Sequence, residues 1–74
     1  MPLKPLAYRE VRKRLLSLGF QEVAAKGSHV KFSKVEEAGT RTAIVPSHRE
    51  VAVGTIRSIL RQAGITEDVW NGLA

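Results

Sequence analysis

Two histidines, at positions 29 and 48, are the side chains of this 74-residue chain best able to exchange protons near neutral pH. His29 follows Gly27-Ser28, and His48 follows Pro46-Ser47. Such an imidazole is suited to cutting RNA, because each ribose supplies its own nucleophile, the 2′-hydroxyl beside the phosphate. The protein must remove that proton, stabilise the phosphorane oxygens and protonate the leaving 5′-oxygen. His29 is therefore the candidate catalytic residue, and a surface histidine without a role is the alternative.

The other residues of these two segments have less defined roles. Ser28 is a poor nucleophile for His29 to activate, since adjacent strand residues point to opposite faces, and it is predicted to contact phosphate or support the turn. Gly27 fits a turn with positive φ, with a place in a phosphate cradle as the alternative. His48 fits a second acid or base or a phosphate contact, and equally a loop residue that fixes the turn. Two histidines without a nearby carboxylate pair or cysteine make a poor metal site, so no metal and no other cofactor is expected.

The basic residues are unevenly distributed along the chain. Twelve Lys and Arg stand against 7 Asp and Glu, a net charge of +5. Residues 1–34 hold eight basic and two acidic residues, whereas residues 35–74 hold four basic and five acidic residues. The basic half predicts a polyanionic partner, RNA or DNA rather than a membrane, with a solvated charged surface as the alternative. The predicted phosphate-binding lysines, which surround the first histidine in sequence, are Lys26, Lys31 and Lys34.

Length and composition exclude several classes of protein. The chain is long enough for one domain, predicted to span residues 1–74. It has no cysteine, which rules out disulfides and thiolate metal sites and favours the cytoplasm. No apolar run approaches the roughly 20 residues that span a bilayer, and the N-terminal residues do not resemble a signal peptide. We therefore expect a cytoplasmic protein with no membrane partner.

The apolar pattern predicts an α+β fold in the order α-β-β-β-α. Both helices should pack on one face of a three-stranded antiparallel sheet, because each has a single apolar stripe. The predicted elements are a helix over Leu6–Leu18 ended by Gly19, strands over Phe20–Ala25, Ser28–Lys34 and Thr40–Val45, a loop over Ser47–Ala52, a helix over Val53–Ala63 ended by Gly64, and a short last helix capped by Thr66, with Trp70 in the core.

Alternation in the middle strand gives the first histidine a predicted orientation. Val30 and Phe32 should point toward the helices, so His29 and Lys31 should point to the open face of the sheet. A bulge or a one-residue slip would reverse this assignment.

On the first helix, Glu10 and Arg14 are spaced to pair at i, i+4. Arg9 and Lys13 share another strip of this helix, which is exposed and free for a partner.

Three segments of the chain, taken together with their order and spacing, resemble a known family, and the resemblance extends from the first helix to Ile65. They are Gly27-Ser28-His29, Ile44-Val45-Pro46-Ser47-His48 and the stretch from Gly54 to Ile65. The chain resembles the HicA, or YcfA-like, toxins of toxin–antitoxin systems. The resemblance implies a double-stranded-RNA-binding-like fold, a ribonuclease that cleaves messenger RNA and so inhibits translation, and a HicB-type antitoxin that covers the active site. It also implies that His29 is catalytic. The competing interpretation is a non-catalytic RNA-binding module of the same fold, which would hold RNA by shape and backbone charge.

Overall fold

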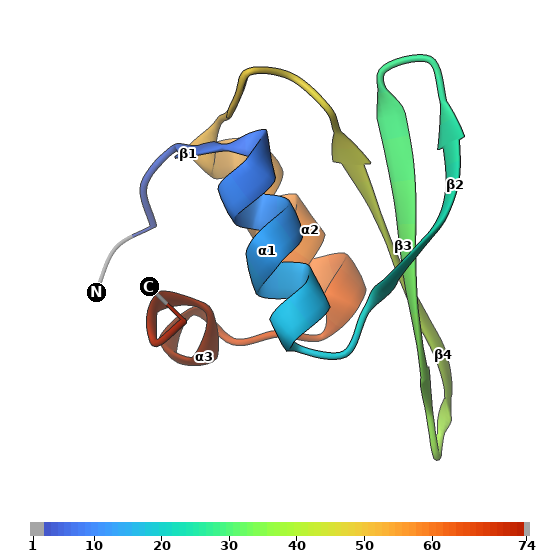
Figure 1. The fold of residues 1–74 in the computed structure, drawn as a ribbon. Coiled ribbons are helices and arrows are strands. Elements are labelled where there is room, and N and C mark those ends of the chain that lie inside the picture. The colour runs from blue at the N-terminus through green and yellow to red at the C-terminus, as the bar shows by residue number, and fades with distance from the viewer. Residues whose placement is uncertain (1–2, 74) are drawn as a thin grey trace.

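The computed structural model describes residues 3–73 and has a three-stranded sheet on one side and helices on the other (Figure 1). The three-stranded sheet is antiparallel in the order β2-β3-β4, and a separate two-stranded ribbon joins β1 to β5. The elements in chain order are β1 (Leu6–Ala7), α1 (Tyr8–Ser17), β2 (Gln21–Lys26), β3 (His29–Glu36), β4 (Gly39–Pro46), β5 (Glu50–Val51), α2 (Val53–Ala63) and α3 (Glu67–Asn71).

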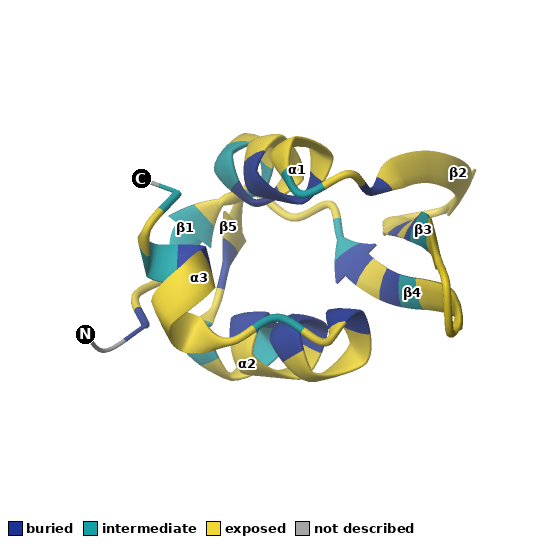
Figure 2. Ribbon diagram, turned by 90° about the horizontal axis from the view of Figure 1, so that it is seen from below, coloured by how far each residue is buried: buried dark blue, intermediate teal, exposed yellow. Residues whose placement is uncertain are grey.

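Both long helices lie on the same side of the sheet, as their apolar stripes predict (Figure 2). The buried residues of the two helices lie on the sides of the ribbons that are turned toward each other, whereas β2 is exposed along its whole length. The predicted α+β fold is therefore confirmed. The core residues are Leu3, Val11, Leu15, Phe20, Val30, Phe32, Ala43, Val45, Val51, Ile56, Ile59, Leu60, Ala63 and Trp70.

The beginning of the first helix was predicted wrongly. Leu6 and Ala7 are extended, and they pair with Val51 and Glu50 in the two-stranded ribbon. The helix therefore begins at Tyr8, and the segment predicted as a loop between the third strand and the second helix contains β5. This pairing joins residues more than forty positions apart in the chain, so the helical period of the neighbouring residues does not reveal it.

The remaining boundaries agree with the predicted ones or differ by one or two residues. Helix α2 has the predicted limits, and Gly64 ends it with a φ of 70°. Thr66 caps α3 by accepting a hydrogen bond from the Val69 N–H at 3.2 Å. No helix within residues 3–73 has the length and apolarity needed to cross a membrane.

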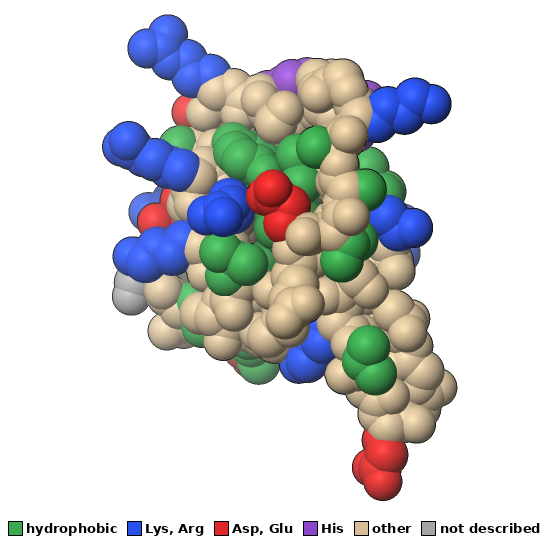
Figure 3. All heavy atoms as spheres, turned by 45° about the vertical axis from the view of Figure 1, so that its right-hand side comes forward, with side chains coloured by type: hydrophobic (Ala, Val, Ile, Leu, Met, Phe, Trp, Pro, Cys, Tyr) green, Lys and Arg blue, Asp and Glu red, His purple; other side chains and the backbone are tan. Residues whose placement is uncertain are grey.

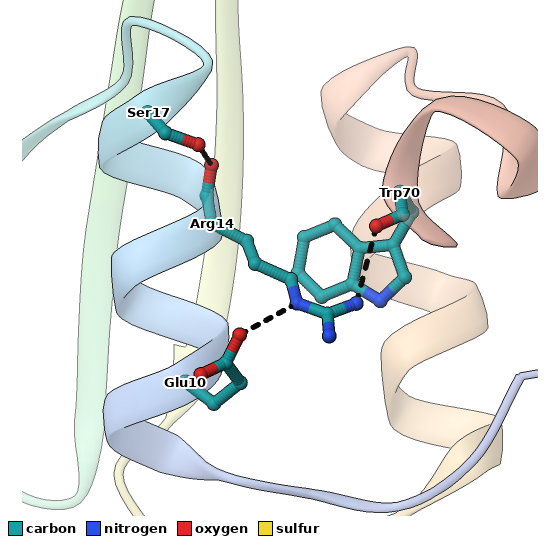
Figure 4. Close-up of polar contacts among 4 residues, drawn as sticks. All are labelled: Glu10, Arg14, Ser17 and Trp70. Carbon is teal, nitrogen blue, oxygen red and sulfur yellow. Dashed lines mark hydrogen bonds and ion pairs between the residues drawn. The ribbon is translucent and has the colours of Figure 1, made fainter. Parts of the chain in front are cut away.

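A buried arginine joins α3 to α1 (Figure 4). The Nε of Arg14 donates to a Glu10 carboxylate oxygen at 2.9 Å, which confirms the predicted pair. The Nη1 of Arg14 donates to the Trp70 carbonyl at 3.1 Å, and the guanidinium lies 5.3 Å from the centre of the Trp70 ring. The hydrogen bond from Arg14 lowers the pKa of the Glu10 carboxyl. These contacts fix the C-terminal helix against the first.

Candidate functional site

His29 is the first residue of β3 and is exposed on the open face of the sheet. Val30 and Phe32 are buried beneath the helices, whereas His29 and Lys31 are exposed. The alternation expected in this strand is thus confirmed, and β3 itself contains no bulge where it pairs with β4. The imidazole is therefore accessible from solvent.

A bulge in β2 places Lys26 beside His29. The register shifts between Glu22 and Ala24, which leaves Val23 as an extra residue without a partner in β3. Before the bulge, Glu22 faces the helices and forms an ion pair with Arg12 of α1 at 3.2 Å. After it, Lys26 lies directly opposite His29. The extra residue reverses the faces of the following strand residues, so Lys26 shares the open face with His29.

The turn before His29 consists of Gly27 and Ser28. Gly27 has a φ of 59°, and Ser28 has a negative φ, a combination that suits a two-residue hairpin with glycine at its first central position. The predicted turn role of Gly27 is confirmed. The Ser28 carbonyl accepts hydrogen bonds from the Ser47 N–H at 2.6 Å and the Ser47 hydroxyl at 3.1 Å. Two segments separated by 19 residues are therefore joined directly beside the first histidine.

The loop that contains His48 connects this turn to the beginning of α1. Pro46 pairs with His29 in the sheet, and the exposed His48 follows two residues later. The Arg49 carbonyl then accepts a hydrogen bond from the Tyr8 N–H at 3.4 Å. Figure 3 shows histidine side chains along the upper edge of the molecule, with basic side chains projecting on both sides. One end of the molecule thus gathers both histidines.

Lys34 does not join the lysines near His29. It lies on the helix-facing side of β3, where its ammonium is 5.9 Å from the centre of the Phe20 ring and 3.9 Å from a Glu36 carboxylate oxygen. Five positions separate it from His29, an odd number, so alternation directs the two side chains to opposite faces. Lys34 was predicted to bind phosphate together with Lys26 and Lys31 because it is close to them in sequence. The alternation of side chains along the strand places it on the opposite side of the sheet.

The cations that remain at the site are available for a ligand. Lys26, Lys31 and Arg49 form no ion pair within residues 3–73, whereas Arg12, Arg14, Lys34 and Arg41 all pair with glutamates. Over the same residues, no group of three or more His, Cys, Asp or Glu side chains is arranged to hold a metal ion. Unpaired cations beside an exposed imidazole suit a ligand that carries phosphates.

Sequence reasoning did not assign a site role to Tyr8 or Arg49. Neither residue was predicted to bind a ligand or to take part in catalysis. Arg49 could have been recognised as a candidate from the sequence, because it directly follows His48. The contact between Arg49 and Tyr8 depends on the β1–β5 ribbon, which no local pattern indicates.

The family model described as the HicA toxin of bacterial toxin–antitoxin systems matches residues 8–65. This range contains both histidine segments and the stretch from Gly54 to Ile65, and it ends before α3. No curated protein matches the chain closely enough to count as a relative. The chain therefore belongs to the HicA toxin family of bacterial toxin–antitoxin systems.

Proposed function

We propose that this toxin is a metal-independent endoribonuclease that cleaves messenger RNA in the cytoplasm through His29 and thereby inhibits translation. The observation that carries the proposal is the exposure of His29 on the open face, opposite Lys26 and beside the loop of His48. Family membership supports the role of a toxin, and the site geometry supports RNA as its target.

The chemistry follows from the groups at the site. The neutral imidazole of His29 takes the proton of a ribose 2′-hydroxyl, and the oxygen attacks the adjacent phosphorus. The bond from phosphorus to the 5′-oxygen breaks, which leaves a 2′,3′-cyclic phosphate and, after protonation, a 5′-hydroxyl. His48 is the candidate acid for that protonation. Lys26 and Lys31 stabilise the negative charge on the phosphorane oxygens.

The partner of such a toxin is a cognate antitoxin, and we propose one of the HicB type that covers His29. The open side of the sheet supports this proposal because it presents exposed apolar side chains together with the unpaired cations. Val23 is 53% exposed, Val35 82% and Ile44 39%. Apolar surface ringed by charge is typical of a protein interface.

The first test incubates purified toxin with RNA in the presence of a chelator. We expect the wild type to cut RNA, and His29→Ala to cut at least about 100-fold more slowly, since general acid–base catalysis contributes about that much or more. His29→Ala should still bind RNA, because the cations remain. Equal cutting by both proteins would indicate a contaminating nuclease. Binding without cutting by the wild type would favour the non-catalytic module.

The second test examines the toxin in cells. Expression of the wild type should arrest growth, and expression of His29→Ala should not. Co-expression of a small neighbouring gene that encodes the antitoxin should relieve the arrest. Arrest by His29→Ala at equal protein levels would contradict a catalytic role for the imidazole.

A further inference from the structure

A recess lies beside the loop that contains His48, at the beginning of α1. It has a volume of about 350 Å³ and is lined by Ala7, Tyr8, Arg9 and Arg49. This size falls within the range of small-ligand sites, roughly 300–1,000 Å³. The cleavage chemistry proposed for His29 uses none of these side chains.

The lining combines two guanidinium groups with a phenol ring. Arg9 and Arg49 are exposed and form no ion pair within the described residues. Tyr8 is partly buried and packs against the core, which holds its ring in place. Burial, and to a lesser extent the Glu22 carboxylate, raise the pKa of its hydroxyl, so the phenol is neutral at physiological pH. Guanidinium groups bind phosphates through paired hydrogen bonds, and aromatic rings stack on nucleobases.

The recess is connected to the catalytic candidate by a short, fixed piece of chain. Pro46 pairs with His29, and Arg49 follows three residues later, a span of at most roughly 11 Å between Cα atoms. Both ends of this loop are held, one by the Ser47 bonds to the Ser28 carbonyl and the other by the Tyr8 bond to the Arg49 carbonyl. A nucleotide close to the one at His29 is therefore within reach of the recess.

We propose that this recess is a nucleotide subsite, in which one unpaired base near the cleaved phosphate stacks on Tyr8 while Arg9 and Arg49 hold its phosphates. The proposal rests on the proposed ribonuclease function and specifies its substrate class. Stacking on Tyr8 requires a base that is free of a duplex, so the site selects single-stranded RNA or a loop over a continuous double helix.

The first experiment measures binding of a short, labelled, single-stranded RNA to toxin that carries His29→Ala, so that cleavage does not interfere. Arg9→Ala and Arg49→Ala should each weaken binding about ten-fold or more, as expected for a lost charged hydrogen bond. Arg61→Ala is the matched control, because Arg61 is also exposed and without an ion pair among the described residues but lies in the last turn of α2. It should leave the affinity nearly unchanged.

The second experiment tests stacking. Tyr8→Leu should weaken binding about five-fold or more, whereas Tyr8→Phe should retain the affinity, because it keeps the ring. An RNA in which the nucleotide near the cleavage position lacks its base should bind both variants equally. Circular dichroism of each variant reports whether the fold is retained, and the two arginine variants test the subsite independently of Tyr8.

The results of these experiments distinguish the proposed subsite from the proposed nuclease activity. Equal affinities of Arg9→Ala, Arg49→Ala and Arg61→Ala would overturn the subsite, even if the wild type cuts RNA. Weaker binding by the first two without cutting by the wild type would support the subsite and reject the chemistry at His29. Absence of both cutting and RNA binding would overturn the two proposals together.

Discussion

At the scale of single residues, Arg14 shows how a charge can stabilise this small core. It is the only charged side chain that is buried among residues 3–73, with 6% of its surface exposed. Its nitrogens bond to Glu10 and to the Trp70 carbonyl, and its guanidinium lies over the Trp70 ring. The arginine therefore links α1 to a helix that lies outside the family-matched range.

We predict that Arg14→Ala lowers the free energy of unfolding by about 2–4 kcal/mol, because a charged hydrogen bond and a cation–π contact are lost together. Urea denaturation of the purified protein measures this change. Arg12→Ala is the control, since Arg12 also pairs with a glutamate but is 47% exposed. That exposed pair should contribute less than about 1 kcal/mol. Equal losses for the two variants would contradict a structural role of the buried arginine.

At the scale of elements, the β2–β3 hairpin is the unit that positions the catalytic candidate. Gly27 supplies the positive φ of its turn, and the bulge at Val23 directs Lys26 to the same face as His29. The Ser47 bonds then hold the loop of His48 against the turn. A change in the turn should therefore affect both stability and cleavage.

Gly27→Ala should lower the free energy of unfolding by about 1 kcal/mol, because a side chain disfavours positive φ. A methyl group at this position would meet no atom within 4 Å, so backbone strain is the only cost. Cleavage should also slow, since His29 follows the turn directly. Gly54→Ala is the matched control: it lies in α2, also in open space, and should stabilise the protein by about 0.4–1 kcal/mol. Unfolding in urea and initial rates of RNA cleavage test both variants. If Gly27→Ala were as stable as Gly54→Ala, the turn would not require glycine at position 27.

At the scale of the whole molecule, the two sides of the sheet present different kinds of side chains. One side holds the apolar core and several paired charges, and the other presents the first histidine and the unpaired lysines. Lys31 and Lys34 lie three positions apart in β3, on opposite sides. They therefore test which side of β3 RNA contacts.

The prediction concerns the salt dependence of RNA binding. For single-stranded RNA, each phosphate contact adds about −0.7 to the slope of log affinity against log salt concentration. In a His29→Ala background, Lys31→Ala should weaken binding and reduce the magnitude of this slope by about 0.7, whereas Lys34→Ala should leave the slope unchanged. Titrations of labelled RNA at several salt concentrations provide the measurement. An equal effect of the two lysines would show that RNA also contacts the helix-facing side of β3.

The features that depend on a local pattern could be predicted from the sequence. Helical periodicity located α2, alternation in β3 separated His29 and Lys31 from Val30 and Phe32, and Gly27 indicated a turn. These features follow from backbone geometry over a few residues, so a single segment contains the information. Lys34 was predicted to bind phosphate because it is close to His29 in sequence, and the structure shows that it lies on the helix-facing side of β3.

Contacts between distant segments could not be predicted in this way. The bond between Ser28 and Ser47 spans 19 residues, and the bond between Arg14 and Trp70 spans 56. The recess at Tyr8 and Arg49 likewise requires the β1–β5 ribbon to form. Such contacts are selected by the joint packing of the helices and the sheet around one core, and no single segment carries a pattern for them. His29 could thus be predicted as the catalytic candidate from the sequence, whereas the residues that other segments bring near it could not.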